Sequence, residues 1–165
     1  MNYIEDHRRM QARSEKPRDF GILLALSYVA FVDELRANLA AAGFADLHRS
    51  FGYVARTLAE RPRSLRELAG LLELTSQGAL KIVDAMERDG YLTKHADPKD
   101  GRAIELRLSK KGRAALRAAR RFHARFEAEL AERMGQRSVA NLREVLEAVV
   151  SRHEQAGAPL TLRPL

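Results

Sequence analysis

The first stretch of helical periodicity in the chain lies between Asp19 and Ala42. Its apolar residues recur at spacings of three and four, as they do on one face of a helix, and Gly43 is a natural end. These apolar residues are Leu23, Leu24, Leu26, Ala30, Phe31, Leu35 and Leu39. They cover more than one narrow stripe, so we predict a long helix that contacts its own domain on one side and another surface, such as a partner subunit, on a second.

Shorter helical segments follow. A helix is predicted over Asp46–Glu60, because Arg61 and Pro62 interrupt the pattern after it. Ser64 and Glu67 have the spacing of a capping box, in which each side chain satisfies a backbone N–H of the other residue at the start of a helix. The helix that they begin is predicted to bury Leu65, Leu68, Ala69 and Leu72.

A further short helix is predicted after a tight turn. Thr75 is a good N-cap, and Gly90 is well suited to the position just beyond a helix that ends near Asp89. Helical geometry predicts that one face packs inward, with Ala79, Ile82, Val83 and Met86. The opposite face is predicted to be outward, with Thr75, Ser76, Gln77, Leu80, Lys81 and Asp84.

The next segments alternate apolar and polar residues and then return to helical spacing. Residues 91–96 and 103–108 are predicted to be strands, joined by a turn-rich, basic tip at residues 97–102. A long helix is predicted from Ser109 to Met134, and a last one from Ser138 to about Gln155.

This order of elements predicts a single domain over residues 1–165 that is mainly α with a small β-hairpin. Its centre would be a winged helix-turn-helix, flanked by long N- and C-terminal helices that form a dimer. We place the N-terminal helices at 19–60, the winged helix-turn-helix at 61–108 and the C-terminal dimerisation helices at 109–156.

Composition narrows the function. The chain has no cysteine, which excludes disulfides, thiolate zinc sites and thiol oxidation. No phosphate-binding loop, nucleophile elbow or metal-ligand cluster is evident, so we predict neither an enzyme nor a metal or cofactor. The absence of a long apolar stretch predicts a soluble, cytoplasmic protein that does not contact membranes.

The net charge of +7 favours an anionic partner. Residues 1–60 carry 8 basic and 8 acidic side chains, whereas residues 61–113 carry 12 and 8. The positive charge therefore begins where the helix-turn-helix begins. In such an arrangement the second helix enters the major groove of DNA and the hairpin reaches the neighbouring minor groove.

The predicted DNA-binding residues lie on the two short helices and the hairpin. They are Ser64, Arg66, Thr75, Ser76, Gln77, Leu80, Lys81, Lys94, Lys99, Asp100 and Arg102. Gln77 can pair with adenine, Leu80 can contact a thymine methyl group, and Lys81 suits guanine or phosphate. The alternative for each residue is a solvated surface position.

Arg102 is the strongest single candidate, because a guanidinium is attracted into a narrow minor groove and Asp100 can orient it. The alternative is a surface ion pair in a turn. A set of flanking cations is expected to contain phosphate contacts, although only part of it is expected to lie near the DNA. The set is Arg61, Arg63, Arg66, Lys94, Lys99 and Arg107.

Two stretches carry a resemblance to a known family. RSLRELAGLLELTSQGALKIVDAMERDGYL resembles the helix-turn-helix of the MarR family (multiple antibiotic resistance regulators), and DPKDGRAIELRLSKKGR resembles its wing and the following helix start. The resemblance implies a homodimer with intertwined terminal helices, bound to a pseudo-palindromic double-stranded operator. It also implies repression that a small aromatic ligand relieves, and a wing in which Asp100 supports Arg102 on DNA. Gly78 and Leu80 depart from the commonest family pattern.

Other interpretations stay open. Five aromatic residues could line a ligand pocket, but core packing explains them equally well. They are Tyr28, Phe31, Phe51, Tyr53 and Phe122. A winged-helix protein-interaction module without DNA binding is the alternative function, which Gly78 and Leu80 favour. An enzyme acting on an aromatic ligand lacks any catalytic constellation.

Overall fold

The computed structural model describes residues 18–96 and 104–157, which divide into two units between Arg36 and Ala37. The described part of the first unit is helical and consists of α2 (Phe20–Ala41) up to Arg36, and the end of α2 belongs to the second unit. Helix α2 agrees with the predicted helix, and the Asp19 carboxylate accepts a hydrogen bond from the N–H of Gly21 at 2.9 Å. Its exposed apolar residues surround the helix: Phe20, Ile22, Leu23, Leu24, Leu26, Tyr28 and Val29. A helix that is apolar on all sides requires further contacts to be stable in water.

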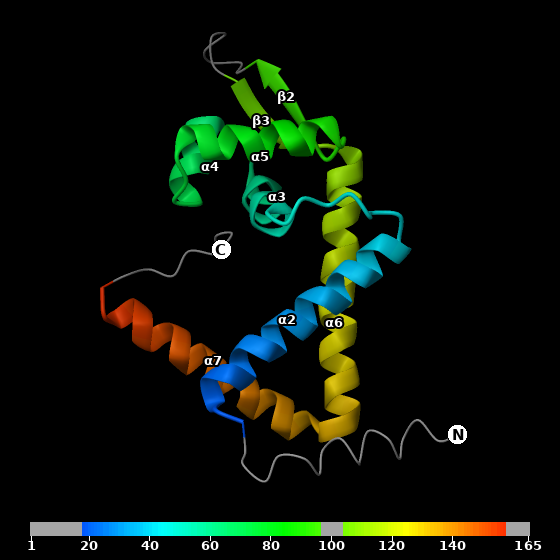
Figure 1. Ribbon diagram of the computed structural model, residues 1–165, viewed down its shortest axis with the longest axis vertical. Helices are drawn as coiled ribbons and strands as arrows, with labels where there is room; N and C mark the ends of the chain where they lie inside the picture. Colours follow the sequence, from blue (N-terminus) through cyan, green and yellow to red (C-terminus); the bar gives the residue numbers. More distant parts are fainter. Residues whose placement is uncertain (1–17, 97–103, 158–165) are drawn as a thin grey trace. The chain divides into compact units, whose positions relative to one another are not determined.

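The second unit contains the remaining elements in the order of a winged helix (Figure 1). They are α3 (Phe51–Glu60), β1 (Arg63–Ser64), α4 (Leu65–Leu71), α5 (Ser76–Arg88), β2 (Leu92–Ala96), β3 (Ile104–Leu108), α6 (Lys110–Met134) and α7 (Gln136–Gln155). The mainly α fold with a β-hairpin is therefore confirmed. The bounds of α4, α5 and α6 agree with the prediction to within one residue at most ends.

Helix α3 is shorter than predicted. It begins at Phe51 instead of Asp46, because the preceding segment forms turns. The Nδ1 of His48 accepts a hydrogen bond from the N–H of Ser50 at 3.1 Å, which fixes the last of these turns. Burial is the main cause that lowers the pKa of His48, and the neutral ring can act as this acceptor.

The sheet has one strand more than the predicted hairpin. Strands β2 and β3 pair antiparallel with Leu92 opposite Leu108, and the two-residue β1 pairs with the other edge of β3. The strand order is β1-β3-β2. A strand of two residues has no periodicity to detect, so sequence analysis could not find β1.

The core of the second unit lies between these helices and the sheet. It is built from the apolar faces of α3, α4, α5 and α6 together with inward residues of β2 and β3. Val54, Leu68, Val83 and Met86 are fully buried. This core fixes α4 and α5 against the sheet, and their other faces remain available to a partner.

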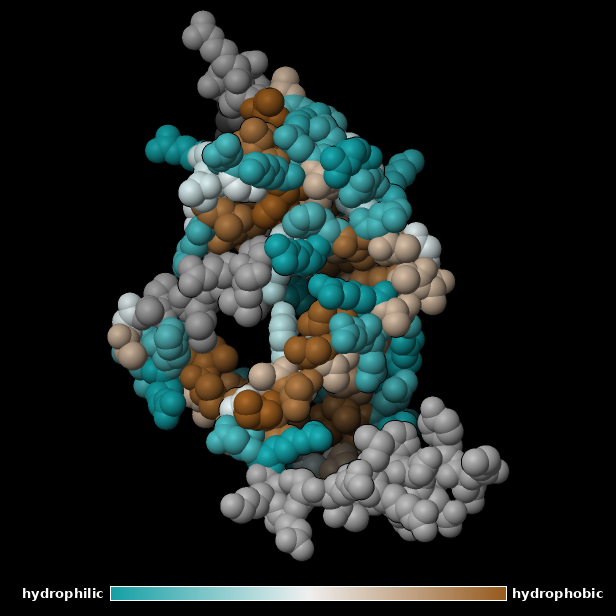
Figure 2. All heavy atoms as spheres, in the orientation of Figure 1, coloured by the Kyte–Doolittle hydropathy of each residue, from teal (hydrophilic) through white to brown (hydrophobic). Residues whose placement is uncertain are grey.

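Helix α7 has no buried residue. Gly135, with φ of 87°, separates it from α6, and the Nη2 of Arg143 donates to both carboxylate oxygens of Glu127 on α6, each at 2.7 Å. The helix begins at Gln136 instead of Ser138. Half-exposed apolar residues form one stripe along it, visible in the α7 region of Figure 2: Leu142, Val145, Leu146, Val149 and Val150.

Candidate nucleic-acid interface

Both helices of the helix-turn-helix begin with side-chain caps. The Ser64 hydroxyl accepts from the N–H of Glu67 at 3.2 Å, and the Glu67 carboxylate accepts from the N–H of Ser64 at 2.8 Å. The predicted capping box is therefore confirmed. Thr75 caps α5 in the same way, since its hydroxyl accepts from the N–H of Gly78 at 3.0 Å. Each cap satisfies backbone donors that a helix start leaves unpaired.

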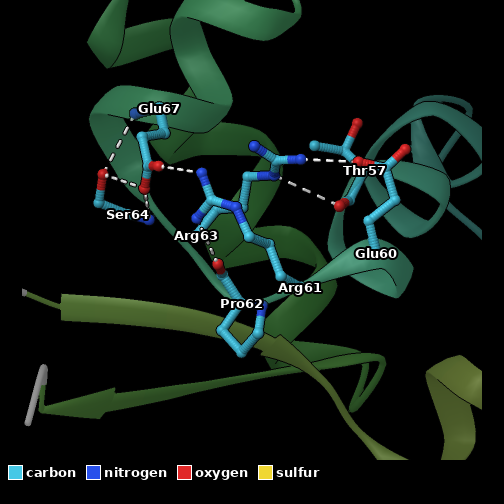
Figure 3. A network of polar contacts seen from close by, with 7 residues as sticks. All are labelled: Thr57, Glu60, Arg61, Pro62, Arg63, Ser64 and Glu67. Atoms are coloured by element: carbon cyan, nitrogen blue, oxygen red, sulfur yellow. Dashed lines mark hydrogen bonds and ion pairs between the residues drawn. The ribbon is translucent and has the colours of Figure 1, made fainter.

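Figure 3 shows how the start of α4 is tied to its surroundings. Arg61 donates to Glu67 at 2.6 Å, and Arg63 donates to Glu60 at 2.7 Å and to the carbonyl oxygen of Thr57. The hydrogen bond from the Ser64 backbone, followed by that from Arg61, lowers the pKa of Glu67 to about 2. Arg61 and Arg63 thus have carboxylate partners within the chain, which leaves them less available as phosphate contacts.

The outward face of α5 is the one that the sequence predicted. Ala79, Val83 and Met86 are buried, and Ile82 is partly buried. The predicted outward residues, Thr75, Ser76, Gln77, Leu80, Lys81 and Asp84, are all exposed. The first half of this face offers a hydroxyl, an amide, an apolar side chain and an ammonium group, which are the types that contact base edges and phosphates in the major groove.

Gly78 lies beside the cap of this helix. A β-carbon at Gly78 would stand 3.2 Å from the Thr75 hydroxyl oxygen, closer than most such contacts. The glycine therefore leaves room for the cap, which gives the departure at this position a structural reason. It also leaves the first turn of α5 without a side chain at this position.

The predicted cations of α4 and α5 differ from those of the strands in whether they have a carboxylate partner. Arg66 and Lys81 are exposed, and neither forms an ion pair with a described residue. Arg107, in contrast, is bonded to Glu105. Ser64 is only partly exposed, and its hydroxyl is already used in the α4 cap.

Lys94 has an arrangement that the sequence did not reveal. Its ammonium group lies 2.7 Å from a carboxylate oxygen of Asp84 and 2.6 Å from one of Glu87. The hydrogen bond with Asp84, followed by that with Glu87, raises the pKa of Lys94. Because the pair joins a strand to a helix, no local sequence spacing could indicate it.

The tip of the wing lies outside the described residues. The predictions for Lys99, Asp100 and Arg102 fall there, and they stay predictions.

A close junction joins α5 to α6. The Ser109 hydroxyl donates to the carbonyl oxygen of Gly90 at 2.7 Å and accepts from the N–H of Gly112 at 2.9 Å. The Ser109 N–H also donates to the Tyr91 carbonyl oxygen at 3.1 Å. The Ser109 hydroxyl thus both caps α6 and bonds to Gly90, which lies just beyond the end of α5.

The predicted ligand pocket stays a prediction. Phe51 packs in the core against Tyr91, with ring centroids 5.4 Å apart, and Phe122 is buried beside Phe126. Tyr53 lines a half-open cavity of about 190 Å³. The other lining residues are Arg56, Thr57, Glu60, Arg63, Leu71 and Leu72. Tyr28 and Phe31 belong to the first unit.

Neither a metal-binding cluster nor a membrane-spanning helix is found among the residues that the structure describes. Within 18–96 and 104–157, no three histidine or acidic side chains come together in a way that could hold a metal ion. No helix in these ranges has the length and apolarity needed to cross a bilayer.

Comparison with known proteins identifies the fold. Residues 45–103 match the sequence model of the MarR family, and this stretch contains α3, β1, α4, α5 and β2 but ends before β3. Over these residues the chain is similar to the MarR family. The resemblance found in the sequence is therefore confirmed.

A curated relative supports the assignment over a similar length. An uncharacterized HTH-type transcriptional regulator of Bacillus subtilis, YkoM, is 33% identical over 63 residues, which are 38% of this chain. The chain matches about two fifths of that relative, 41% of its length.

Solved structures extend the likeness to most of the chain. FabT of Streptococcus pneumoniae, solved in complex with DNA, has a TM-score of 0.68 at 22% identity, over 82% of this chain and 95% of FabT. The transcriptional repressor CouR, bound to a 23-mer DNA duplex, has a TM-score of 0.62 at 26% identity, over 79% of this chain and 92% of CouR. The helices outside the helix-turn-helix thus also follow the architecture of these proteins.

Proposed function

We propose that this protein is a sequence-specific, double-stranded DNA-binding transcriptional regulator. The observation that carries the proposal is the division of α5, which buries Ala79, Val83 and Met86 while Gln77 and Lys81 are exposed on the other side. A helix held in this way can enter a major groove without disturbing the core. FabT and CouR, to which the chain is similar, were both solved with DNA.

Electrostatics favour the same surface. Arg66 on α4 and Lys81 on α5 are exposed cations without a carboxylate partner among the described residues. Cations of this kind bind phosphates and release the counterions condensed on DNA, so affinity falls as salt rises. On this proposal Arg66 and Lys81 are phosphate contacts, and Ser76, Gln77 and Leu80 lie nearest to the bases.

We propose that the regulator acts as a homodimer. The apolar stripe on α7 has a spacing of three and four residues and lies exposed in the single chain. Covering it with a second copy would remove apolar surface from water, which is favourable. Two-fold symmetry would then present two α5 helices to successive major grooves about 34 Å apart, and this matches a pseudo-palindromic operator.

Repression relieved by a small aromatic ligand completes the proposal. The support is the family fold and the aromatic residues of the predicted pocket. A ligand that binds the DNA-free form would lower the affinity for DNA by linkage. DNA would lower the affinity for the ligand by the same factor. A set of phenolic and aromatic carboxylates, added to a preformed complex with DNA, tests this part.

Fluorescence anisotropy with a labelled duplex from the region upstream of the protein's own gene tests DNA binding. Wild-type protein should bind with an affinity that falls steeply with salt. Arg66→Gln should weaken binding and reduce the slope of log affinity against log salt by about 0.9, the share of one phosphate contact. A suitable control is Arg133→Gln, which removes the same charge from an exposed position in the last turn of α6.

The results separate a regulator from a protein-interaction module. Salt-dependent binding that Arg66→Gln weakens and Arg133→Gln does not would support the proposal. Binding that is absent at low salt, or equally weakened in both variants, would refute the placement of DNA on α4 and α5.

A further inference from the structure

The ion pairs between Lys94 of β2 and the carboxylates of Asp84 and Glu87 on α5 lie at the proposed DNA-facing surface. Asp84 lies two turns after Gln77 and one turn after Leu80 on the outward face of α5, and its side chain is 53% exposed. Glu87 follows one turn later and is 40% exposed. Helix α5 therefore places two carboxylates on or beside the face that would approach phosphates.

Uncompensated carboxylates would oppose DNA binding. Like charges three residues apart on a helix repel each other, and both would repel the phosphate backbone. The single ammonium of Lys94 lies within 2.7 Å of both carboxylates. It thereby neutralises part of a negative charge that the outward face of α5 otherwise presents to DNA.

The backbone of β2 positions this ammonium. Alternate residues of a strand lie on the same side, so Lys94 shares the side of Leu92, which is buried against the core. The Lys94 side chain is only 26% exposed, less than either carboxylate. The aliphatic part of the Lys94 side chain thus lies along the protein surface, and its ammonium group contacts α5.

We infer that Lys94 is a positioning residue, which allows α5 to approach DNA by holding and neutralising Asp84 and Glu87 and does not itself contact phosphate. This inference rests on the proposed DNA-binding function. It replaces the sequence-based prediction of Lys94 as a direct DNA contact. Exposed ion pairs contribute little to folding, so the effect of removing Lys94 belongs mainly to DNA binding.

The salt dependence of binding distinguishes the two roles. A lysine that contacts phosphate contributes about 0.9 to the slope of log affinity against log salt, whereas a lysine that is paired within the protein contributes nothing to it. Lys94→Gln should therefore weaken binding about tenfold at fixed salt and leave the slope unchanged. The matched variant Lys81→Gln removes an exposed lysine of α5 and should reduce both affinity and slope.

A rescue variant tests whether the carboxylates of Asp84 and Glu87 cause the weaker binding of Lys94→Gln. The triple variant Asp84→Asn, Glu87→Gln, Lys94→Gln removes the carboxylates together with the lysine. It should bind DNA to within about threefold of wild type, because the repulsion has been removed with its counter-charge. Urea unfolding of each variant without DNA should give midpoints close to wild type, which shows that the differences do not come from unfolding.

Each outcome has a definite meaning. A reduced slope in Lys94→Gln, or a triple variant as weak as the single one, would overturn the inference while leaving DNA binding intact. If wild-type protein shows no salt-dependent binding and Lys81→Gln changes nothing, the proposed function fails and the inference fails with it.

Discussion

The backbone of Gly112 lies directly against the carbonyl group of Tyr91. A β-carbon added at Gly112 would overlap the Tyr91 carbonyl oxygen and would also press on the side chain of Leu108. The obstacle is backbone, so a rotamer change cannot relieve it. This close approach places the first turn of α6 against Tyr91, the residue that precedes β2.

Gly112→Ala should consequently destabilise the protein by about 3 kcal/mol, because the first turn of α6 must move away from the backbone of Tyr91. Urea unfolding measures the effect. The matched control is Gly52→Ala in α3, where a β-carbon meets nothing within 4 Å. This variant should be stabilised by about 0.5–1 kcal/mol, since alanine is favoured over glycine in helices. Equal stability of the two variants would contradict this packing.

Tyr91→Phe should make the protein more stable. The Tyr91 hydroxyl is buried and has no hydrogen-bond partner among the described residues, and an unpaired buried polar group costs about 1–3 kcal/mol. The phenylalanine ring would keep the edge contact with Phe51 and the position under the Lys111 ammonium, which lies 4.2 Å from the ring centroid.

Urea unfolding of Tyr91→Phe should show a gain of about 1 kcal/mol. Tyr91→Leu is the control, because it removes the hydroxyl together with the ring contacts and should be destabilised. A decrease in the stability of the phenylalanine variant would show that the hydroxyl is bonded in solution.

The cap of α4 should depend on pH. Glu67 has a folded pKa of about 2, below its ordinary value of 4.5, so its contribution to stability is complete above about pH 4.5 and is lost as pH falls towards 2. Unfolding measured between pH 2 and 6 should show this slope. Glu67→Gln removes the titrating carboxylate, and the part of the slope that belongs to this residue should disappear. The carboxylate is exposed, so the effect is expected to be small.

The apolar stripe of α7 should control assembly. Leu146→Lys places a charge in the middle of the stripe and should shift a dimer to monomer in sedimentation experiments, because burying the charge is costly. Glu144→Lys also adds a lysine, but on the opposite side of α7, and should leave assembly unchanged. Dimers of equal stability in both variants would place the interface elsewhere.

The sequence predicted the elements whose pattern is local. Ser64 with Glu67 and Thr75 before α5 are signals within four residues, so the caps and the outward face of α5 followed from spacing alone. The predicted start of α3 at Asp46 was wrong, because a turn at His48–Ser50 precedes the helix, which begins at Phe51. The two-residue β1 and the partners of Lys94 depend on segments that are distant in the chain. Such interactions arise from tertiary packing, which periodicity does not encode.

A single oxygen atom, the hydroxyl of Ser109, bonds both to Gly90, just beyond the end of α5, and to Gly112 in the first turn of α6. With the hydrogen bond from the Ser109 N–H to Tyr91 and that from the Lys111 ammonium to the Asp89 carbonyl oxygen, it joins the start of α6 directly to the residues that follow α5. We therefore expect a tilt of α6, whatever its origin, to carry the C-terminal end of α5 with it. In a symmetric pair, such coupled tilting would alter the separation of the two DNA-reading helices, and thereby the half-site spacing that the protein accepts.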